Sequence, residues 1–355
     1  MKRNHSIDIL KVICSFLVII IHISWNFKAQ ILPLTRCAVP CFFMISGFFL
    51  YQDGGIKLSK VTKTLKNMFK ITLWFSLLFV VYSEYLNIKG NNELFIPAIR
   101  SVCSWIFCNN FPFAYHLWYL YAYIYVLSIV YFVEKYRKWK LLFTSIPILL
   151  SMSVVFYLLP FVDIEIPLPI FRNFLFIGLP FFALGSFIKS RYHLIIRKIN
   201  IKYLTCCSII LMFLTIFEAM FLINIGEDPY KEIYLCTPIL SVILFLIFLS
   251  IKVDKPNWLS MIGEQDTLYI YLLHPIFTYI VFLTSITIGI VSIVNWISPF
   301  AVFIVTLIFL HVFRRYIKSK KYKKESTASC EKNDFAGENS TVQINRQNVD
   351  DVSLL

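Results

Sequence analysis

Apolar runs long enough to cross a lipid bilayer recur along this chain and limit its possible folds more than any other feature. A membrane-spanning helix needs about 20 predominantly apolar residues, because the hydrocarbon core is about 30 Å thick. The sequence therefore predicts an all-α polytopic transmembrane helix bundle of about ten spans. Arg36 and Pro40 interrupt the second run, so a broken or re-entrant helix is an alternative there. The runs lie at 7–27, 34–51, 67–86, 115–134, 141–159, 172–189, 203–223, 234–251, 267–287 and 291–313.

The composition excludes a soluble multi-domain protein. Of 355 residues, 58% are hydrophobic and only 15% are charged, and the mean hydropathy is +0.71. The net charge of +14 would suggest nucleic acid as the partner of a soluble protein. In a membrane protein, basic residues instead record topology and attraction to lipid headgroups, so we expect membrane lipids and no nucleic acid as partners.

The distribution of Lys and Arg predicts the orientation of the bundle. With the N-terminus in the cytoplasm, the cytoplasmic segments as far as Lys324 hold 25 of these residues and the external connections hold 6. Positive residues accumulate on the cytoplasmic side, so both termini are expected there, in a multi-pass protein of the cell membrane. From 318 the chain turns polar. We therefore predict a membrane domain at 1–317 and a disordered cytoplasmic tail at 318–355.

The first expected helix carries a polar stripe. At 100° per residue, Asp8, Lys11, Ser15, His22 and Asn26 project on one face, which lipid would not tolerate. Lys11 and His22 are separated by about 16 Å along the axis, at a rise of about 1.5 Å per residue. Ionisable residues at membrane depth are candidates for a functional site. An interhelical hydrogen bond accounts for them equally well.

Other ionisable residues near the outer side have simpler explanations. Arg36 and Arg172 fall at span ends, where side chains reach for lipid headgroups, and this is favoured over a site role. Glu218 lies deeper, where a packing hydrogen bond is favoured over ion coupling. His116 precedes Trp118 at an interface position, so anchoring and substrate contact both remain open.

Two further positions combine packing with polar chemistry. Pro275 follows His274 and, lacking an N–H, frees the backbone carbonyl of Tyr271 four residues earlier. A kinked helix whose polar groups satisfy one another explains this pattern without a function. Ser46 and Gly47 are small residues, and close helix packing is the favoured interpretation of this pair.

Four segments in order carry a family resemblance. They are Ser6–Lys11 with His22 eleven residues further on, Val39–Phe48, His116–Leu120 and Tyr269–Pro275. Together they resemble the bacterial acyltransferase family 3, integral-membrane O-acyltransferases that modify surface polysaccharides. The resemblance covers nearly the whole chain before the tail.

Two departures from the family pattern concern the substrates. Lys11 stands where most members have arginine, which keeps the charge but loses the bidentate fork for phosphate. The glutamate-bearing motif of members that act on O-antigen is absent after Trp118. The chain is therefore more similar to the short, single-domain members, whose acceptors are diverse.

The resemblance implies transfer of an acyl group, with acetyl as the favoured group, from cytoplasmic acyl-CoA to a sugar hydroxyl of a cell-envelope polysaccharide or exopolysaccharide. The acceptor glycan is either free or linked to a lipid. The resemblance also implies that His22 is the general base or, as the weaker alternative, a transient acyl carrier. Lys11, Asp8 and Ser46 are the implied donor-binding residues. His116, Trp118 and His274 are the implied acceptor or pocket residues. Acyl-CoA is then a co-substrate, with no bound cofactor and no metal expected.

Two other classes of function remain open from the sequence. A polysaccharide or small-molecule transporter or exporter also suits a polar stripe with a buried histidine. A membrane domain that senses or scaffolds a glycan assembly complex would tolerate replacement of His22. Release of CoA that depends on His22 separates the enzyme from both.

Overall fold

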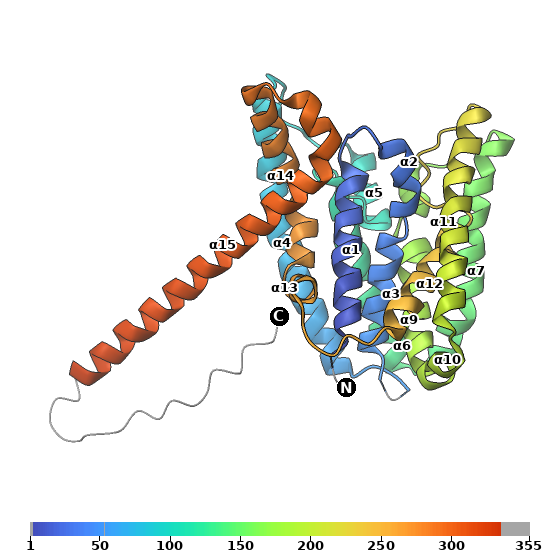
Figure 1. The fold of residues 1–355 in the computed structure, drawn as a ribbon, viewed down its shortest axis with the longest axis horizontal. Helices are drawn as coiled ribbons and strands as arrows, with labels where there is room; N and C mark the ends of the chain where they lie inside the picture. The colour runs from blue at the N-terminus through green and yellow to red at the C-terminus, as the bar shows by residue number, and fades with distance from the viewer. Residues whose placement is uncertain (1–2, 53, 335–355) are drawn as a thin grey trace.

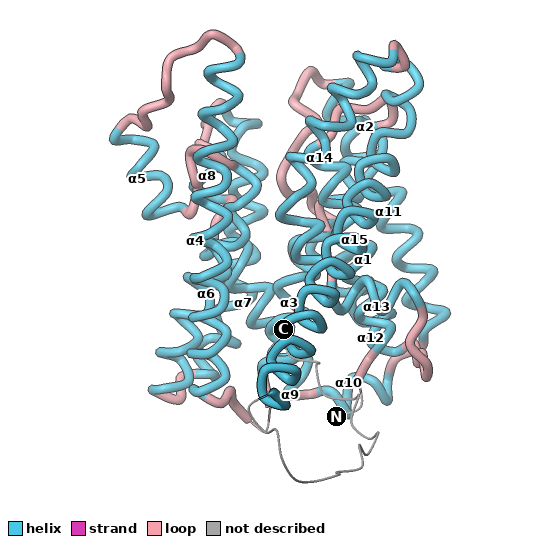
Figure 2. The backbone as a smooth tube through the Cα atoms, turned by 90° about the vertical axis from the view of Figure 1, so that its left-hand side faces the viewer, coloured by secondary structure: helices cyan, strands magenta, loops and turns pink. Residues whose placement is uncertain are grey.

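The computed structural model describes the backbone of residues 3–52 and 54–334, and side chains as far as residue 320. Throughout these residues the chain forms helices joined by loops, and Figure 2 shows no strand among them. Most helices run along a common direction, while α15 leans away from the bundle (Figure 1). The predicted all-α polytopic bundle is confirmed.

The bounds of the helices follow the expected runs closely. The longer helices are α1 (His5–His22), α3 (Ala38–Leu50), α4 (Leu58–Lys89), α6 (Trp118–Lys135), α7 (Trp139–Leu158), α9 (Leu179–Ser190), α11 (Ile201–Asn224), α12 (Thr237–Ser250), α14 (Thr267–Ile288) and α15 (Val291–Asp334), and a shorter helix α2 (Lys28–Thr35) precedes α3. Short helices are α5 (Ile99–Cys108), α8 (Leu168–Phe171), α10 (Tyr192–Lys198) and α13 (Trp258–Gln265). Single turns of other helix types are η1 (Tyr115–Leu117), η2 (Leu159–Val162) and η3 (Phe174–Gly178).

Nine segments of the described chain are long and apolar enough to cross a membrane. The expected span at 234–251 is the exception, because its helix α12 has only 14 residues. At about 1.5 Å per residue, such a helix covers about 21 Å and is shorter than the hydrocarbon core.

The second apolar run is broken, as the alternative interpretation of the sequence proposed. Helix α2 ends at Thr35 and α3 begins at Ala38, with Arg36 and Cys37 between them. Pro40 lies in the first turn of α3, where its missing N–H costs no intrahelical hydrogen bond. The break therefore precedes the proline and places Arg36 between two helices.

The first helix is shorter than expected. It ends at His22, and Ile23 has an extended backbone. Asn26 lies beyond the helix, where its backbone N–H donates to the carbonyl of Asn295 over 3.1 Å. The prediction that Asn26 shares the polar face of this helix was therefore wrong.

Glycines allow the closest helix contacts in the core. A Cβ atom on Gly47 of α3 would lie 2.0 Å from the carbonyl oxygen of Phe182 in α9. A Cβ atom on Gly185 of α9 would lie 2.0 Å from the carbonyl oxygen of Met44 in α3. The two backbones therefore touch, as in small-residue crossings of membrane helices. This contact sets α3 firmly beside α9 and confirms the packing role of Gly47.

Helix α15 extends beyond the predicted domain boundary at 317, and the disorder of the tail stays a prediction. Helix α15 continues through 318–334, and 335–355 lie outside the described residues. The start of α1 and the far end of α15 lie toward the same end of the molecule (Figure 1). These two helix ends can therefore lie on the same side of a membrane. Which side that is stays a prediction.

Candidate active site

Three histidines that are far apart in the sequence meet inside the bundle. His22 ends α1, His116 lies in η1 before α6, and His274 lies in α14. Their ring centroids are 5.1 Å apart for His22 and His274, 5.4 Å for His116 and His274, and 6.4 Å for His22 and His116. His116 and His274 are buried, whereas His22 retains exposed surface. Of the three, His22 is therefore the one that a substrate can reach.

The orientation of His274 follows from the proline after it. Pro275 has no N–H for the carbonyl of Tyr271, and His274 Nδ1 lies 2.6 Å from that oxygen instead. A carbonyl only accepts, so Nδ1 is the protonated nitrogen. The Nε2 atom of His274 is buried and has no hydrogen-bond partner among the described residues. In a neutral ring, this nitrogen keeps its lone pair, and the ring as a whole lies beside that of His22.

Tyr271 links the same proline-containing turn to the third histidine. Its hydroxyl donates to the backbone carbonyl of His116. His116 also packs edge-on against Phe79 of α4, with ring centroids 4.5 Å apart. These contacts hold η1 against α14, so two of the three rings are fixed by buried neighbours.

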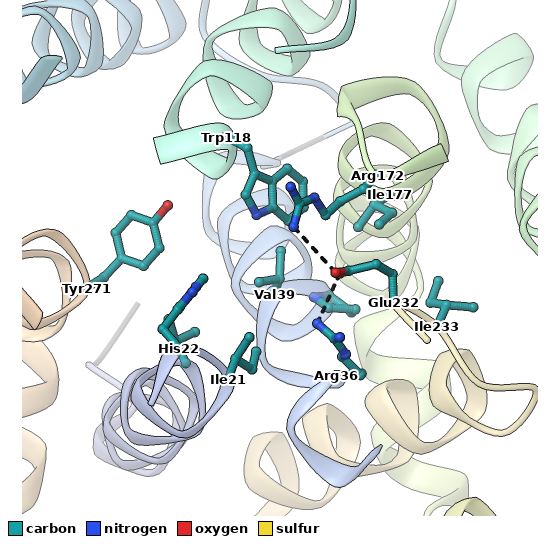
Figure 3. A pocket seen from close by; sticks show the side chains of 12 residues that line it. Ile21, His22, Arg36, Val39, Trp118, Arg172, Ile177, Glu232, Ile233 and Tyr271 are labelled. Carbon is teal, nitrogen blue, oxygen red and sulfur yellow. Dashed lines mark hydrogen bonds and ion pairs between the residues drawn. The ribbon is translucent and has the colours of Figure 1, made fainter. Parts of the chain in front are cut away.

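His22 opens into a small cavity, the central pocket, of about 40 Å³ (Figure 3). Trp118, which the sequence indicated, lines this pocket together with Tyr271. His116 and His274 lie behind His22 rather than among the lining residues. The full lining is Val18, Ile21, His22, Arg36, Val39, Pro40, Trp118, Arg172, Ile177, Glu232, Ile233 and Tyr271.

Two arginines and a glutamate form the opposite wall of the central pocket (Figure 3). Arg36 Nη1 lies 3.0 Å from Glu232 Oε2, and Arg172 Nη1 lies 3.4 Å from Glu232 Oε1. The side chains of Arg36 and Arg172 are only 8% and 12% exposed. The Arg172 guanidinium also lies 5.6 Å from the ring centroid of Trp118.

This wall corrects the interpretation of the two arginines as headgroup anchors. Both side chains point inward, because the break between α2 and α3 and the turn after α8 direct them toward Glu232. Sequence reasoning also missed Glu232 altogether. A usable signal existed, since a charge within an apolar run needs a partner of opposite sign. Which acidic residue becomes that partner depends on the path of the irregular loop before α12.

The comparison with protein families matches most of the chain. The family described as "Acyltransferase domain" matches residues 4–315 of the chain. The chain belongs to acyltransferase family 3. It is therefore a membrane acyltransferase with several apolar helices long enough to cross the bilayer.

Two curated proteins are also similar to this family 3 acyltransferase. The serine/alanine racemase of Enterococcus gallinarum is 29% identical over 168 residues, which are 44% of this chain and 21% of that protein. The amino-acid racemase of Enterococcus faecalis is 25% identical over 277 residues, which are 70% of this chain and 38% of that protein. The chain thus spans well under half the length of either relative. No solved structure matches the acyltransferase.

The expected donor-binding residues of the acyltransferase lie away from the histidines. Lys11 Nζ lies 2.8 Å from Asp8 Oδ1, and Arg3 Nε lies 2.9 Å from Asp8 Oδ2. Arg3 also pairs with Glu264 of α13. Asp8 and Lys11 belong to the first two turns of α1. At a rise of about 1.5 Å per residue, they lie about 16 Å or more from His22 along the helix.

Ser46 occupies a third place, on the inner face of α3. It hydrogen-bonds the hydroxyl groups of Tyr119 and Tyr123 on α6. Tyr119 in turn packs against Tyr271, with ring centroids 5.5 Å apart. Ser46 therefore lies beside α6.

Glu218 has the packing role that the sequence favoured. Both of its carboxylate oxygens accept the backbone N–H of Leu235, at 3.0 and 3.1 Å. Tyr157 of α7 contributes a side-chain hydrogen bond to the same carboxylate. Glu218 thus attaches the loop before α12 to α11 and α7, away from the central pocket.

Proposed function

We propose that this acyltransferase moves a short acyl group, with acetyl as the favoured group, from acyl-CoA to a hydroxyl group of a cell-envelope or exopolysaccharide sugar. We also propose that His22 is the general base. One observation carries the proposal. Among the three clustered histidines, His22 alone has exposed surface in a cavity, and His274 supports it from behind with an unpaired Nε2. Such a pair of imidazoles suits proton transfer at neutral pH.

In the proposed reaction, His22 carries one proton from the acceptor hydroxyl to the leaving thiolate. A nitrogen of His22 takes the proton of the acceptor hydroxyl as its oxygen attacks the thioester carbonyl carbon. The tetrahedral intermediate collapses, the carbon–sulfur bond breaks, and the CoA thiolate leaves. The imidazolium then returns the proton to that sulfur, so the products are an O-acyl ester and free CoA. Acyl-CoA is consumed as a co-substrate.

The positions of the basic residues support entry of the donor at the end of the bundle where α1 begins. Lys11, which pairs with Asp8, and the exposed lysines at the start of α4 lie there, and their ammonium groups suit the phosphates of CoA. The thioester then has to extend along the bundle toward His22. The acceptor hydroxyl arrives at the opposite end, where the central pocket lies.

The likeness to two racemases does not change this proposal. The matched region makes up only 21% and 38% of the two racemases. Racemisation is a property of those whole proteins. The histidine cluster and the family match both favour acyl transfer in this chain.

The test is acyl transfer by the purified protein in lipid nanodiscs, with radiolabelled acetyl-CoA and a mixture of envelope glycans. We expect His22→Ala to lower the rate of CoA release by about 100-fold or more, which is the usual contribution of a general base. His193→Ala is the matched control, because His193 is exposed on α10. A folded His22→Ala protein with normal activity would contradict the assignment. Absence of any CoA-dependent signal from the wild type would favour an exporter.

A further inference from the structure

The ion cluster of the central pocket carries one positive charge that no described residue of the lining compensates. Arg36 and Arg172 share the single carboxylate of Glu232, and the remaining lining residues include no other acid. A buried charge without a partner is costly unless a ligand or solvent compensates it. This imbalance is the first sign that the pocket binds an anion.

The hydrogen bonding of the two arginines points the same way. The Nη1 atoms of Arg36 and Arg172 contact the carboxylate of Glu232. The Nε atoms of Arg36 and Arg172 are buried and have no hydrogen-bond partner in the described part of the chain. An Nε–H forms one half of the fork with which arginine binds carboxylate or phosphate in a bidentate manner. Two such donors are therefore unused beside one cavity.

A second, larger cavity adjoins the cluster. This side cavity measures about 310 Å³ and shares Ile177, Glu232 and Ile233 with the central pocket. Its volume lies at the lower end of the range for small-molecule sites, about 300 to 1,000 Å³. Aromatic side chains line it, and rings of this kind pack against the apolar face of a sugar. They are Phe156, Tyr157, Phe171 and Tyr230.

The phosphates of the donor do not explain this anion site. The lysines that suit them lie at the other end of α1, about 16 Å from His22 by the helical rise. Arg36 and Arg172 instead share the central pocket with His22, where the thioester and the acceptor hydroxyl have to meet.

We infer that the acceptor is anionic, and that its carboxylate or phosphate binds to the Nε–H groups of Arg36 and Arg172 while Glu232 stays between them. The sugar occupies the side cavity and directs a hydroxyl group toward His22. The inference rests on the proposed function for the identity of the reaction. Binding of the anion itself requires only the ion cluster and the two cavities.

Binding without acyl-CoA provides the test. The protein is placed in phosphatidylcholine nanodiscs and titrated calorimetrically with methyl glucuronide, methyl glucoside 6-phosphate and neutral methyl glucoside. We expect at least one anionic probe to bind about 10-fold more tightly than the neutral one, in line with a charge-assisted bidentate contact. The tighter of the two names the anion as carboxylate or phosphate.

Variants at the cluster give the specific readout. Arg36→Gln and Arg172→Gln are expected to reduce the preference for the anionic probe to less than about 2-fold. Arg36→Lys and Arg172→Lys keep the charge opposite Glu232, and therefore keep the fold, yet lose the Nε–H fork and most of the preference. Arg100→Gln, on the exposed helix α5, is the control and retains the wild-type preference.

Several results would overturn the inference. These are equal binding of all three probes, a preference that survives both arginine substitutions, and loss of acetyl-CoA affinity in those variants instead. Competition by phosphatidylglycerol in the nanodisc would assign the site to a lipid headgroup and overturn it as well. Probe preference without CoA-dependent transfer would leave the inference standing and refute the proposed function. Equal transfer to neutral and anionic sugars would refute the inference and leave the proposed function standing.

Discussion

Pro275 determines the hydrogen bonding of the histidine that precedes it. Because the proline has no N–H, the Tyr271 carbonyl is free to accept from His274 Nδ1 at 2.6 Å. That bond fixes the ring and leaves Nε2 unpaired beside His22. A residue without a reactive group thus orients the support of the proposed base, as second-layer groups often do in active sites.

Pro275→Ala tests this positioning role. Alanine supplies an N–H that bonds the Tyr271 carbonyl in the ordinary helical manner, so His274 loses its fixed acceptor. We expect kcat for acetyl transfer to fall about 10-fold, because a small misplacement of a catalytic group is costly, while KM for acetyl-CoA stays unchanged. Pro299→Ala in α15 is the control. An unchanged kcat would show that His274 needs no such support.

At the scale of the elements, one helix crossing and one helix break place the site. Gly47 and Gly185 allow the backbones of α3 and α9 to touch. The break between α2 and α3 then directs Arg36 toward Glu232 across the pocket from His22. The ion cluster of Arg36, Arg172 and Glu232 therefore depends on the placement of α3, which this crossing fixes.

Substitution of either glycine in this crossing is expected to destabilise the bundle. A methyl group 2.0 Å from a backbone oxygen forces the helices apart, at a cost of about 3 kcal/mol by analogy with overpacked cores. Gly47→Ala and Gly185→Ala should therefore lower the melting midpoint of the detergent-purified protein, followed by tryptophan fluorescence. Gly90→Ala is the control, because its nearest neighbour is the flexible end of the Asn92 side chain at 3.0 Å. Equal midpoints in all three variants would contradict the argument.

At the scale of the whole molecule, charge distribution predicts orientation. The basic residues concentrate at the end where α1 begins, in the first turns of α4 and in the turns before α7 and α11. The positive-inside rule places this end in the cytoplasm and the central pocket toward the opposite side. Donor and acceptor would then approach the three histidines from opposite ends of one bundle.

Epitope tags provide the measurement of orientation. A tag placed before Lys2 should be hidden from antibody in intact spheroplasts and detected only after permeabilisation. A tag inserted between Asn91 and Asn92, in the exposed turn after α4, should be detected in both conditions. The reverse pattern would place the basic end outside and reverse the proposed directions of substrate entry.

The residues named from the sequence differ in how well their positions could be foreseen. His22, His116 and His274 come together in the bundle and Trp118 lines the central pocket beside His22, while the roles that the resemblance implied for them stay predictions. Asp8 and Lys11 pair with each other near the start of α1, and their role in binding the donor stays a prediction. The arginines were misjudged, because depth in a span does not reveal which way a side chain turns at a helix break.

The amino-acid sequence by itself determined that this chain is a polytopic helical bundle, because backbone groups in hydrocarbon must be satisfied within helices and because apolar length is local information. It also determined the membrane acyltransferase family, through four segments in a fixed order. Only the tertiary structure decided which polar groups face one another. The link between Arg36, Arg172 and Glu232 joins residues up to 196 positions apart, and its partners are chosen by helix packing and by the path of one loop.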